Sequence, residues 1–459
     1  MSFVAIDLTL FALFTLITIV FLYTHKKNLQ RQGILYLYRT RIGLKIIEYT
    51  AKKFPRTLKA LEYVMIVSGF ILMVSMIWLL AKFSYTYITS AFLAQQIKIP
   101  VLLPLFPYVS DLFKIDFLPP FYFTYWVIII AIVAIPHEFF HGIFARLNKI
   151  KVHSTGFGFL GPFLAFFVEP DEKQMAKAKK IPQMAILASG TFANLLVTGV
   201  FLVLMWLFFS LSFAPAGLEF NTYALTPINT SDVTGVSNVT FGNITYGEIN
   251  AYNKTFFISA AWLPTIINKE VPYFFAFDDS PAFNAQIKGV ITEVDGQKIT
   301  SKTALTQALA MHNPGDSINV KTLSNKGKTE NNYDITLGNN NGNAFLGVGF
   351  IPSKPSGLLG WFYSISAKVK TPGVYYTSKI GEFGIFINDM LWWLVIINIS
   401  VALMNMLPLG IFDGGRFFYL AVWGLTGSRK IGEGAFKIST WLLLGLIIAL
   451  MLKWAFAVF

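Results

Sequence analysis

Six apolar stretches, each about as long as a bilayer's hydrocarbon core is thick, constrain this chain more than any other feature. They cover residues 3–23, 63–82, 123–146, 184–213, 385–409 and 434–459. A helix of about 20 apolar residues crosses that core and satisfies its own backbone hydrogen bonds. The sequence therefore predicts a polytopic α-helical membrane protein with about six transmembrane helices.

Composition agrees with this prediction and excludes other classes of protein. Of the 459 residues, 54% are hydrophobic and 13% are charged, which is about half the charged fraction of a soluble domain. Because the sequence has no cysteine, a disulfide framework, a thiolate metal site and a cysteine nucleophile are excluded. The net charge of +13 sits mainly beside apolar stretches, so the expected partner is the lipid bilayer and not nucleic acid.

The charges on the loops predict the orientation of the helices. Residues 25–59 are rich in Lys and Arg and contain Glu48 as their only acid, which places them in the cytosol. Alternation then places residues 147–183 and 416–430 inside, and residues 84–121 and 214–382 outside. The first helix is expected to be an uncleaved anchor, followed by a basic amphipathic segment at 35–53 on the inner leaflet.

The long outside stretch is predicted to form an inserted α+β domain. Residues 289–296 are typical of a strand ending in an Asp-Gly turn, 302–311 of a short helix, and 319–323 and 334–337 of further strands. Residues 338–343 are expected to be a loop. Sequons at Asn229, Asn238, Asn243 and Asn253 agree with an outside location but leave glycosylation open.

The third apolar stretch contains the motif His137-Glu138-Phe139-Phe140-His141. A spacing of four places both imidazoles on one helix face, and two imidazoles with one oxygen ligand suit a catalytic zinc ion. Glu138 is then the expected general base and acid. The alternative is a chance pattern of ordinary core histidines, but ionisable groups inside a spanning helix are costly and usually functional.

The expected third metal ligand is Asp413. It follows Pro408, which ends a helix, and precedes Gly414 and Gly415, which allow close approach of another chain segment. The alternative is a helix-capping role for Asp413.

These two motifs, in this order, resemble the site-2 protease family of intramembrane zinc metalloproteases, whose signatures are HExxH and N-x-x-P-x-x-x-x-D-G. The resemblance implies that His137, His141 and Asp413 bind Zn²⁺ and that Glu138 is catalytic. It also matches Asn194 and Asn405 to family asparagines, whose amides could stabilise the oxyanion or hold the substrate backbone. Hydrogen bonding between helices is the alternative role for both. The segments 39–43, 167–172 and 189–194 extend the resemblance, which leans toward archaeal members. Ser189-Gly190-Thr191 departs from the Gly-Pro of many members.

The resemblance also predicts the domain organisation. Residues 280–282, 291–296 and 313–316 resemble the PDZ modules of bacterial and archaeal proteases, so the insert is expected to be PDZ-like at about 274–350; a small β-rich domain is the alternative. Residues 152–168 resemble the family's membrane-reentrant β-hairpin, with a plain cytosolic loop as the alternative. The expected parts are residues 1–62 (anchor helix and basic segment), 63–213 (first catalytic part), 214–382 (insert) and 383–459 (second catalytic part).

The predicted function is regulated intramembrane proteolysis in a cell membrane, with transmembrane proteins as substrates and the active site near the cytosolic side. The main alternative is a catalytically silent adaptor that binds partner termini through the PDZ-like insert. A membrane metalloprotease with a glutamate as third ligand and a zinc transporter are disfavoured, because the later helices offer no suitable glutamate and the halves show no symmetry. Substrate identity, cleavage position and oligomeric state are not predicted.

Overall fold

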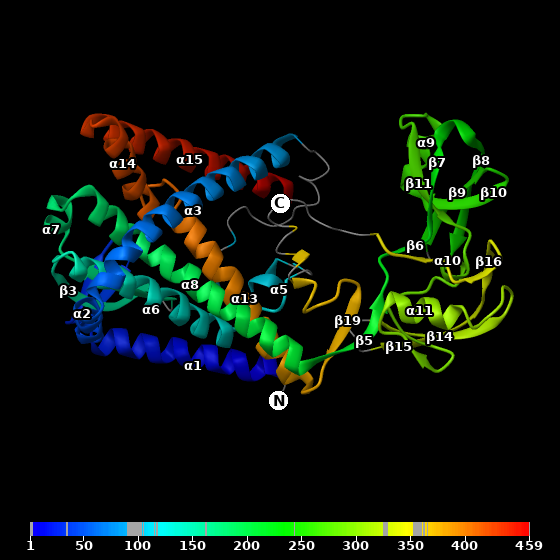
Figure 1. The fold of residues 1–459 in the computed structure, drawn as a ribbon, viewed down its shortest axis with the longest axis horizontal. Helices are drawn as coiled ribbons and strands as arrows, with labels where there is room; N and C mark the ends of the chain where they lie inside the picture. Colours follow the sequence, from blue (N-terminus) through cyan, green and yellow to red (C-terminus); the bar gives the residue numbers. More distant parts are fainter. Residues whose placement is uncertain are drawn as a thin grey trace. The chain divides into compact units, whose positions relative to one another are not determined.

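A computed structural model describes residues 3–458, except residues 34, 90–102, 104, 114, 116–117, 161–162, 243, 325–328, 352–359, 361–362 and 365. The chain divides into two compact units (Figure 1). Met1–Met205 and Phe386–Phe459 form the first, here called the membrane unit, and Trp206–Ile385 form the second, here called the inserted unit.

Within the described residues, six helices are long and apolar enough to cross a bilayer. They are α1 (Phe3–Thr24), α3 (Pro55–Thr89), α6 (Phe123–Leu147), α8 (Lys180–Ser212), α13 (Gly381–Asn405) and α15 (Arg429–Val458). Each corresponds to one apolar stretch of the sequence, so the prediction of six long apolar helices is confirmed. Four shorter helices also lie in the membrane unit: α2 (Leu44–Lys53), α5 (Val109–Leu112), α7 (Glu172–Lys177) and α14 (Asp413–Thr426).

A buried carboxylate from α1 caps the first turn of α6. Asp7 accepts hydrogen bonds from the backbone N–H groups of Phe123 at 2.8 Å and Thr124 at 2.9 Å, and from the Tyr108 hydroxyl at 2.6 Å. The first N–H groups of a helix have no partner within the helix, so this carboxylate satisfies donors that would otherwise be unpaired. Phe11 and Phe14 also pack on Phe123. Helix α1 is thus fixed to the helix that carries the HExxH motif.

A four-stranded antiparallel sheet lies in the membrane unit, in the order β1 (Leu29–Gln32), β2 (Leu35–Thr40), β3 (Val152–Leu160) and β4 (Phe163–Pro170). The predicted hairpin at 152–168 is confirmed as β3 and β4. The segment 35–53 differs from the expected continuous amphipathic segment, because its first part is strand β2 and only its second part is helix α2. Pairing of β2 with β3, far away in sequence, accounts for the difference.

An ion pair joins β2 to β4 across this sheet. Glu169 accepts hydrogen bonds from Arg39 Nε at 2.8 Å and Nη2 at 2.9 Å, and from Ser154 Oγ at 2.7 Å. The hydrogen bond from Arg39 is the main cause that lowers the pKa of the Glu169 carboxyl to about 2. Between the two strands, Gly156 of β3 faces the Tyr38 carbonyl and the Phe167 ring with no room for a side chain.

The inserted unit contains two larger sheets. The first has the order β7 (Leu225–Asn229), β11 (Tyr273–Asp278), β10 (Lys254–Ser259), β9 (Ile244–Ala251) and β8 (Val233–Phe241). The second has the order β15 (Thr329–Thr336), β14 (Ser317–Ser324), β12 (Val290–Val294), β5 (Phe213–Glu219) and β19 (Val374–Ser378), with β13 (Gln297–Lys298) paired to β12. Strands β5 and β19 come from the two ends of the unit, so the second sheet draws on strands outside 274–350. The inserted unit also contains a short antiparallel pair, β6 (Thr222–Tyr223) with β18 (Val348–Gly349). Two of its short helices are α9 (Leu263–Ile267) and α10 (Pro281–Asn284).

The local predictions for this unit are confirmed with one exception. Strands β12, β14 and β15, the Asp295-Gly296 turn and helix α11 (Lys302–Leu309) lie where the sequence predicts them. The prediction of a loop at 338–343 is wrong, because β16 (Gly338–Asn340) and β17 (Asn343–Phe345) form a hairpin there. Its turn is Asn341-Gly342, with φ of 53° and 87°, a dipeptide that favours two-residue hairpins.

Candidate metal centre and active site

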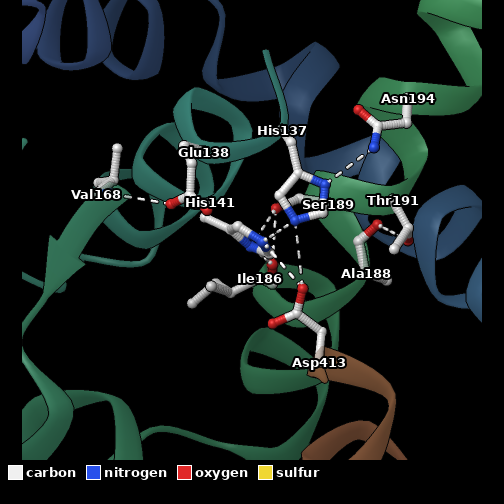
Figure 2. A network of polar contacts seen from close by, with 10 residues as sticks. All are labelled: His137, Glu138, His141, Val168, Ile186, Ala188, Ser189, Thr191, Asn194 and Asp413. Carbon is white, nitrogen blue, oxygen red and sulfur yellow. Dashed lines mark hydrogen bonds and ion pairs between the residues drawn. The ribbon is translucent and has the colours of Figure 1, made fainter. Parts of the chain in front are cut away.

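Helix α6 brings the two histidines of the HExxH motif together. His137 and His141 are one turn apart, and their Nε2 atoms lie 3.1 Å from one another (Figure 2). His137 is buried and His141 is partly buried. The predicted juxtaposition of the two imidazoles is therefore present in the fold.

Asp413 reaches the same point from the second chain segment of the membrane unit, Phe386–Phe459. It is the first residue of α14, after an irregular segment that follows the end of α13 at Asn405. Its Oδ2 atom lies 3.5 Å from His137 Nε2 and 3.2 Å from His141 Nε2. A Cβ on Gly414 would lie 2.6 Å from the Leu407 carbonyl oxygen, so this tight turn requires a glycine.

The three ligand atoms have the spacing of a small metal site. Two imidazole nitrogens and a carboxylate oxygen are ligands that Zn²⁺ accepts, at distances of about 2.1 Å. A tetrahedron with bonds of about 2.1 Å has edges of about 3.4 Å, and the three observed separations are 3.1, 3.2 and 3.5 Å. Among the described residues, this is the group of three that could hold a metal ion.

Helix α8 packs against the back of both imidazoles. The Ile186 carbonyl oxygen lies 2.7 Å from His141 Nδ1, and Asn194 Nδ2 lies 3.3 Å from His137 Nδ1 (Figure 2). Between these two contacts, a Cβ on Gly190 would lie 2.7 Å from His137 Nε2. The close approach of α8 therefore depends on the absence of a side chain at Gly190.

Glu138 lies on the side of α6 that faces strand β4. The Val168 backbone N–H donates a hydrogen bond to Glu138 Oε2 at 2.9 Å. Glu138, both histidines and Asp413 line one cavity of about 510 Å³ in the membrane unit. A carboxylate held beside the candidate metal ligands has the position required for a general base.

The two asparagines predicted from the resemblance lie in different places. Asn405 lines the cavity, whereas Asn194 is fully buried behind His137 and is not among the lining residues. Arg416, the nearest cation in sequence to Asp413, pairs with Glu172 at 2.9 Å.

Three further contributions to this site were missed by the sequence reasoning. These are the Ile186 carbonyl, the Val168 N–H and the glycine at position 190. Two of them are backbone groups, which leave no residue-specific signal. The small-residue run Ser189-Gly190 is a signal for close helix packing, but it does not indicate which helix packs there.

Comparison with known proteins identifies the family to which this sequence belongs. The profile of Peptidase family M50 matches residues 124–450. That range contains Glu138 and all three candidate metal ligands. A search of the curated proteins found no match.

Proposed function

Because the chain belongs to Peptidase family M50, the site-2 protease family, we propose that it is an intramembrane zinc metalloprotease. Its substrate would be another membrane protein, cleaved in or near a transmembrane helix. The observation that carries the proposal is the convergence of His137, His141 and Asp413 on one point beside Glu138, in a unit built from long apolar helices.

The residues fit a zinc ion through His137 Nε2, His141 Nε2 and Asp413 Oδ2. When bound, zinc would supply a Lewis acid that polarises the peptide carbonyl and activates water. Imidazole and carboxylate also suit iron, cobalt and manganese, so the choice of zinc rests on the family.

Glu138 is proposed to move the proton during hydrolysis. The Val168 N–H engages Oε2, which leaves Oε1 to accept a proton from the attacking water and to deliver it to the leaving nitrogen. Asn405, which lines the same cavity, is proposed to hold the substrate backbone or the developing oxyanion with its amide.

Strand β4 is proposed to bind the substrate as an added strand. It is the last strand of its sheet within the described residues, and its Val168 N–H points away from β3 toward Glu138. Because every second backbone N–H of a strand points the same way, the N–H groups of Phe166 and Leu164 also point outward, away from β3. An unwound substrate segment paired to this edge would lie along the wall of the cavity.

The sidedness and the role of the inserted unit are also proposed. The basic loops favour a cytosolic side for the active site and an outer side for the inserted unit in a cell membrane. The second sheet of the inserted unit, with helices α10 and α11, is proposed to be a PDZ-like module that inspects the outer part of the substrate in regulated intramembrane proteolysis. A silent adaptor would have no need of three converging metal ligands at membrane depth.

Cleavage of a model transmembrane substrate tests this function. The parent and Glu138→Gln would each be reconstituted with zinc, and the products would be identified by mass. Cleavage by the parent and none by the variant, at equal zinc content, supports the proposal. A zinc-loaded parent that cleaves none of a panel of transmembrane substrates contradicts it.

A further inference from the structure

The Nδ1 atoms of His137 and His141, which do not face the candidate metal position, have partners of different kinds. A neutral histidine that binds a metal through Nε2 carries its proton on Nδ1, which then needs a hydrogen-bond acceptor. His141 Nδ1 faces the Ile186 carbonyl oxygen at 2.7 Å, and a carbonyl can only accept. His141 Nδ1 therefore carries the proton, and its Nε2 lone pair is available for a metal.

His137 faces an amide in place of a carbonyl. Asn194 Nδ2 lies 3.3 Å from His137 Nδ1, and an amide nitrogen can only donate. In this arrangement Nδ1 accepts, so the proton of the neutral ring sits on Nε2, the atom whose lone pair a metal would need. With the amide in this orientation, His137 Nε2–H would point toward Asp413, and the Nε2 lone pair would not be available to a metal.

The other end of the Asn194 amide can reverse this arrangement. Asn194 is fully buried, and its Oδ1 atom has no hydrogen-bond partner in the described part of the chain. The two ends of a carboxamide have the same shape, so a half turn of the amide places Oδ1 where Nδ2 lies. His137 Nδ1–H can then donate to Oδ1, and the Nε2 lone pair is free.

We propose that Asn194 is a positioning residue that accepts a hydrogen bond from His137 Nδ1 and so makes His137 competent to bind the metal. This inference rests on the proposed function, because it requires a metal at the three ligands. It assigns Asn194 a role on the far side of the ring, in place of contact with the substrate or the oxyanion.

The packing of α8 supports this assignment. Ile186, Gly190 and Asn194 are spaced by four and lie on one face of the helix. The absence of a side chain at Gly190 lets that face lie against both rings. Ile186 then contacts His141 while Asn194 contacts His137 (Figure 2). One helix face thus supplies an acceptor for each imidazole, as groups behind metal-binding histidines commonly do.

Metal affinity of the Asn194 variants tests the inference. Zinc dissociation constants would be measured by competition with a chromophoric chelator for the full-length parent, Asn194→Leu and Asn194→Asp. Loss of an acceptor behind a metal-binding histidine typically weakens affinity about 10- to 100-fold, which is the expectation for Asn194→Leu. Asn194→Asp keeps an acceptor and removes the donor, so it is expected to bind zinc at least as tightly as the parent.

A matched control separates this effect from a general loss of packing. Asn398, on α13, is also fully buried with an unpartnered Oδ1 in the described structure, and its Nδ2 donates to the Leu394 carbonyl. Asn398→Leu is expected to leave zinc affinity unchanged. Thermal unfolding of the metal-free proteins shows which variants fold.

The outcomes are distinct. Parental affinity in Asn194→Leu overturns the inference and leaves the proposed function intact. Weakened binding in Asn194→Asp also overturns it, because the amide donor would then be the group that matters, and this result decides even if Asn194→Leu does not fold. A parent that binds no zinc overturns the proposed function itself.

Discussion

Gly190 lies so close to His141 that a Cβ at position 190 would overlap the imidazole Nε2. Gly190→Ala must therefore push α8 away from α6 or displace both histidines. We expect zinc affinity to fall about 10- to 100-fold, which is the usual effect of disturbing the groups that orient metal ligands. Chelator competition measures this loss.

Gly199→Ala is the matched control for that variant. Gly199 lies on the same helix, and a Cβ added there would have no atom of the described residues within 4 Å. We expect zinc binding and cleavage to remain at the parent's level. Equal zinc affinities for the parent and Gly190→Ala would show that α8 does not define the site.

Phe166→Pro tests the substrate edge of β4. The backbone N–H of Phe166 has the outward direction of Val168, and proline is tolerated on an edge strand because its missing donor faces away from the sheet. We expect kcat/KM to fall about fivefold, the effect of one hydrogen bond of about 1 kcal/mol, with zinc content unchanged. Phe166→Ala keeps the N–H and controls for the lost side chain; an equal loss in both variants would refute strand addition at this position.

Asp7→Ala tests the cap that joins α1 to α6. The change leaves the N–H groups of Phe123 and Thr124 without their carboxylate acceptor in a buried place. We expect the free energy of unfolding to fall by about 2 to 4 kcal/mol, as for loss of a buried charged cap. Unfolding by SDS in mixed micelles measures it. Thr9→Val, an exposed change on the same helix, is expected to have little effect, and equal stabilities for the parent and Asp7→Ala would contradict the capping role.

The ion pair between Arg39 and Glu169 predicts a pH-dependent stability. The pKa of the Glu169 carboxyl is about 2, below its ordinary 4.5, so the folded state favours the ionised form. The stabilisation is present above pH 4.5 and is lost as the pH falls toward 2. The gap in melting temperature between the parent and Glu169→Gln should therefore shrink over this range.

An exposed pair provides the comparison. Glu433 pairs with Arg429 on the surface of α15, and its neutralisation to Gln should change stability little, as is usual for exposed helix pairs. If the melting temperatures of the parent and Glu169→Gln differ by the same amount at pH 7 and at pH 2, the pairing of Glu169 with Arg39 is contradicted.

The parts of the fold that follow from local pattern could be predicted. Apolar length specified the six long helices, and a spacing of four specified that His137 and His141 share a face. Asp413 could be singled out because a carboxylate beside a broken helix end is costly in a membrane unless it is used.

The parts that depend on distant pairing could not be predicted. Residues 35–40 carry alternating apolar side chains beside many positive charges, and only the partner strand β3 makes them a strand. The hydrogen bond between Asp7 and the Phe123 N–H joins α1 to α6, and the sequence predicts each helix but not the contact between them. The roles of Ile186 and Val168 are those of backbone groups, so their residue types carry no signal.

Zinc content per polypeptide tests the central claim most directly. The parent and Asp413→Ala would be purified without chelator, equilibrated with zinc, dialysed and measured by elemental analysis. Asp171→Ala, which removes a carboxylate that pairs with His153 and is not one of the three ligands, is the control. The account predicts one zinc ion per chain in the parent and in Asp171→Ala, and loss of that ion in Asp413→Ala. One tightly held zinc ion in Asp413→Ala would contradict it.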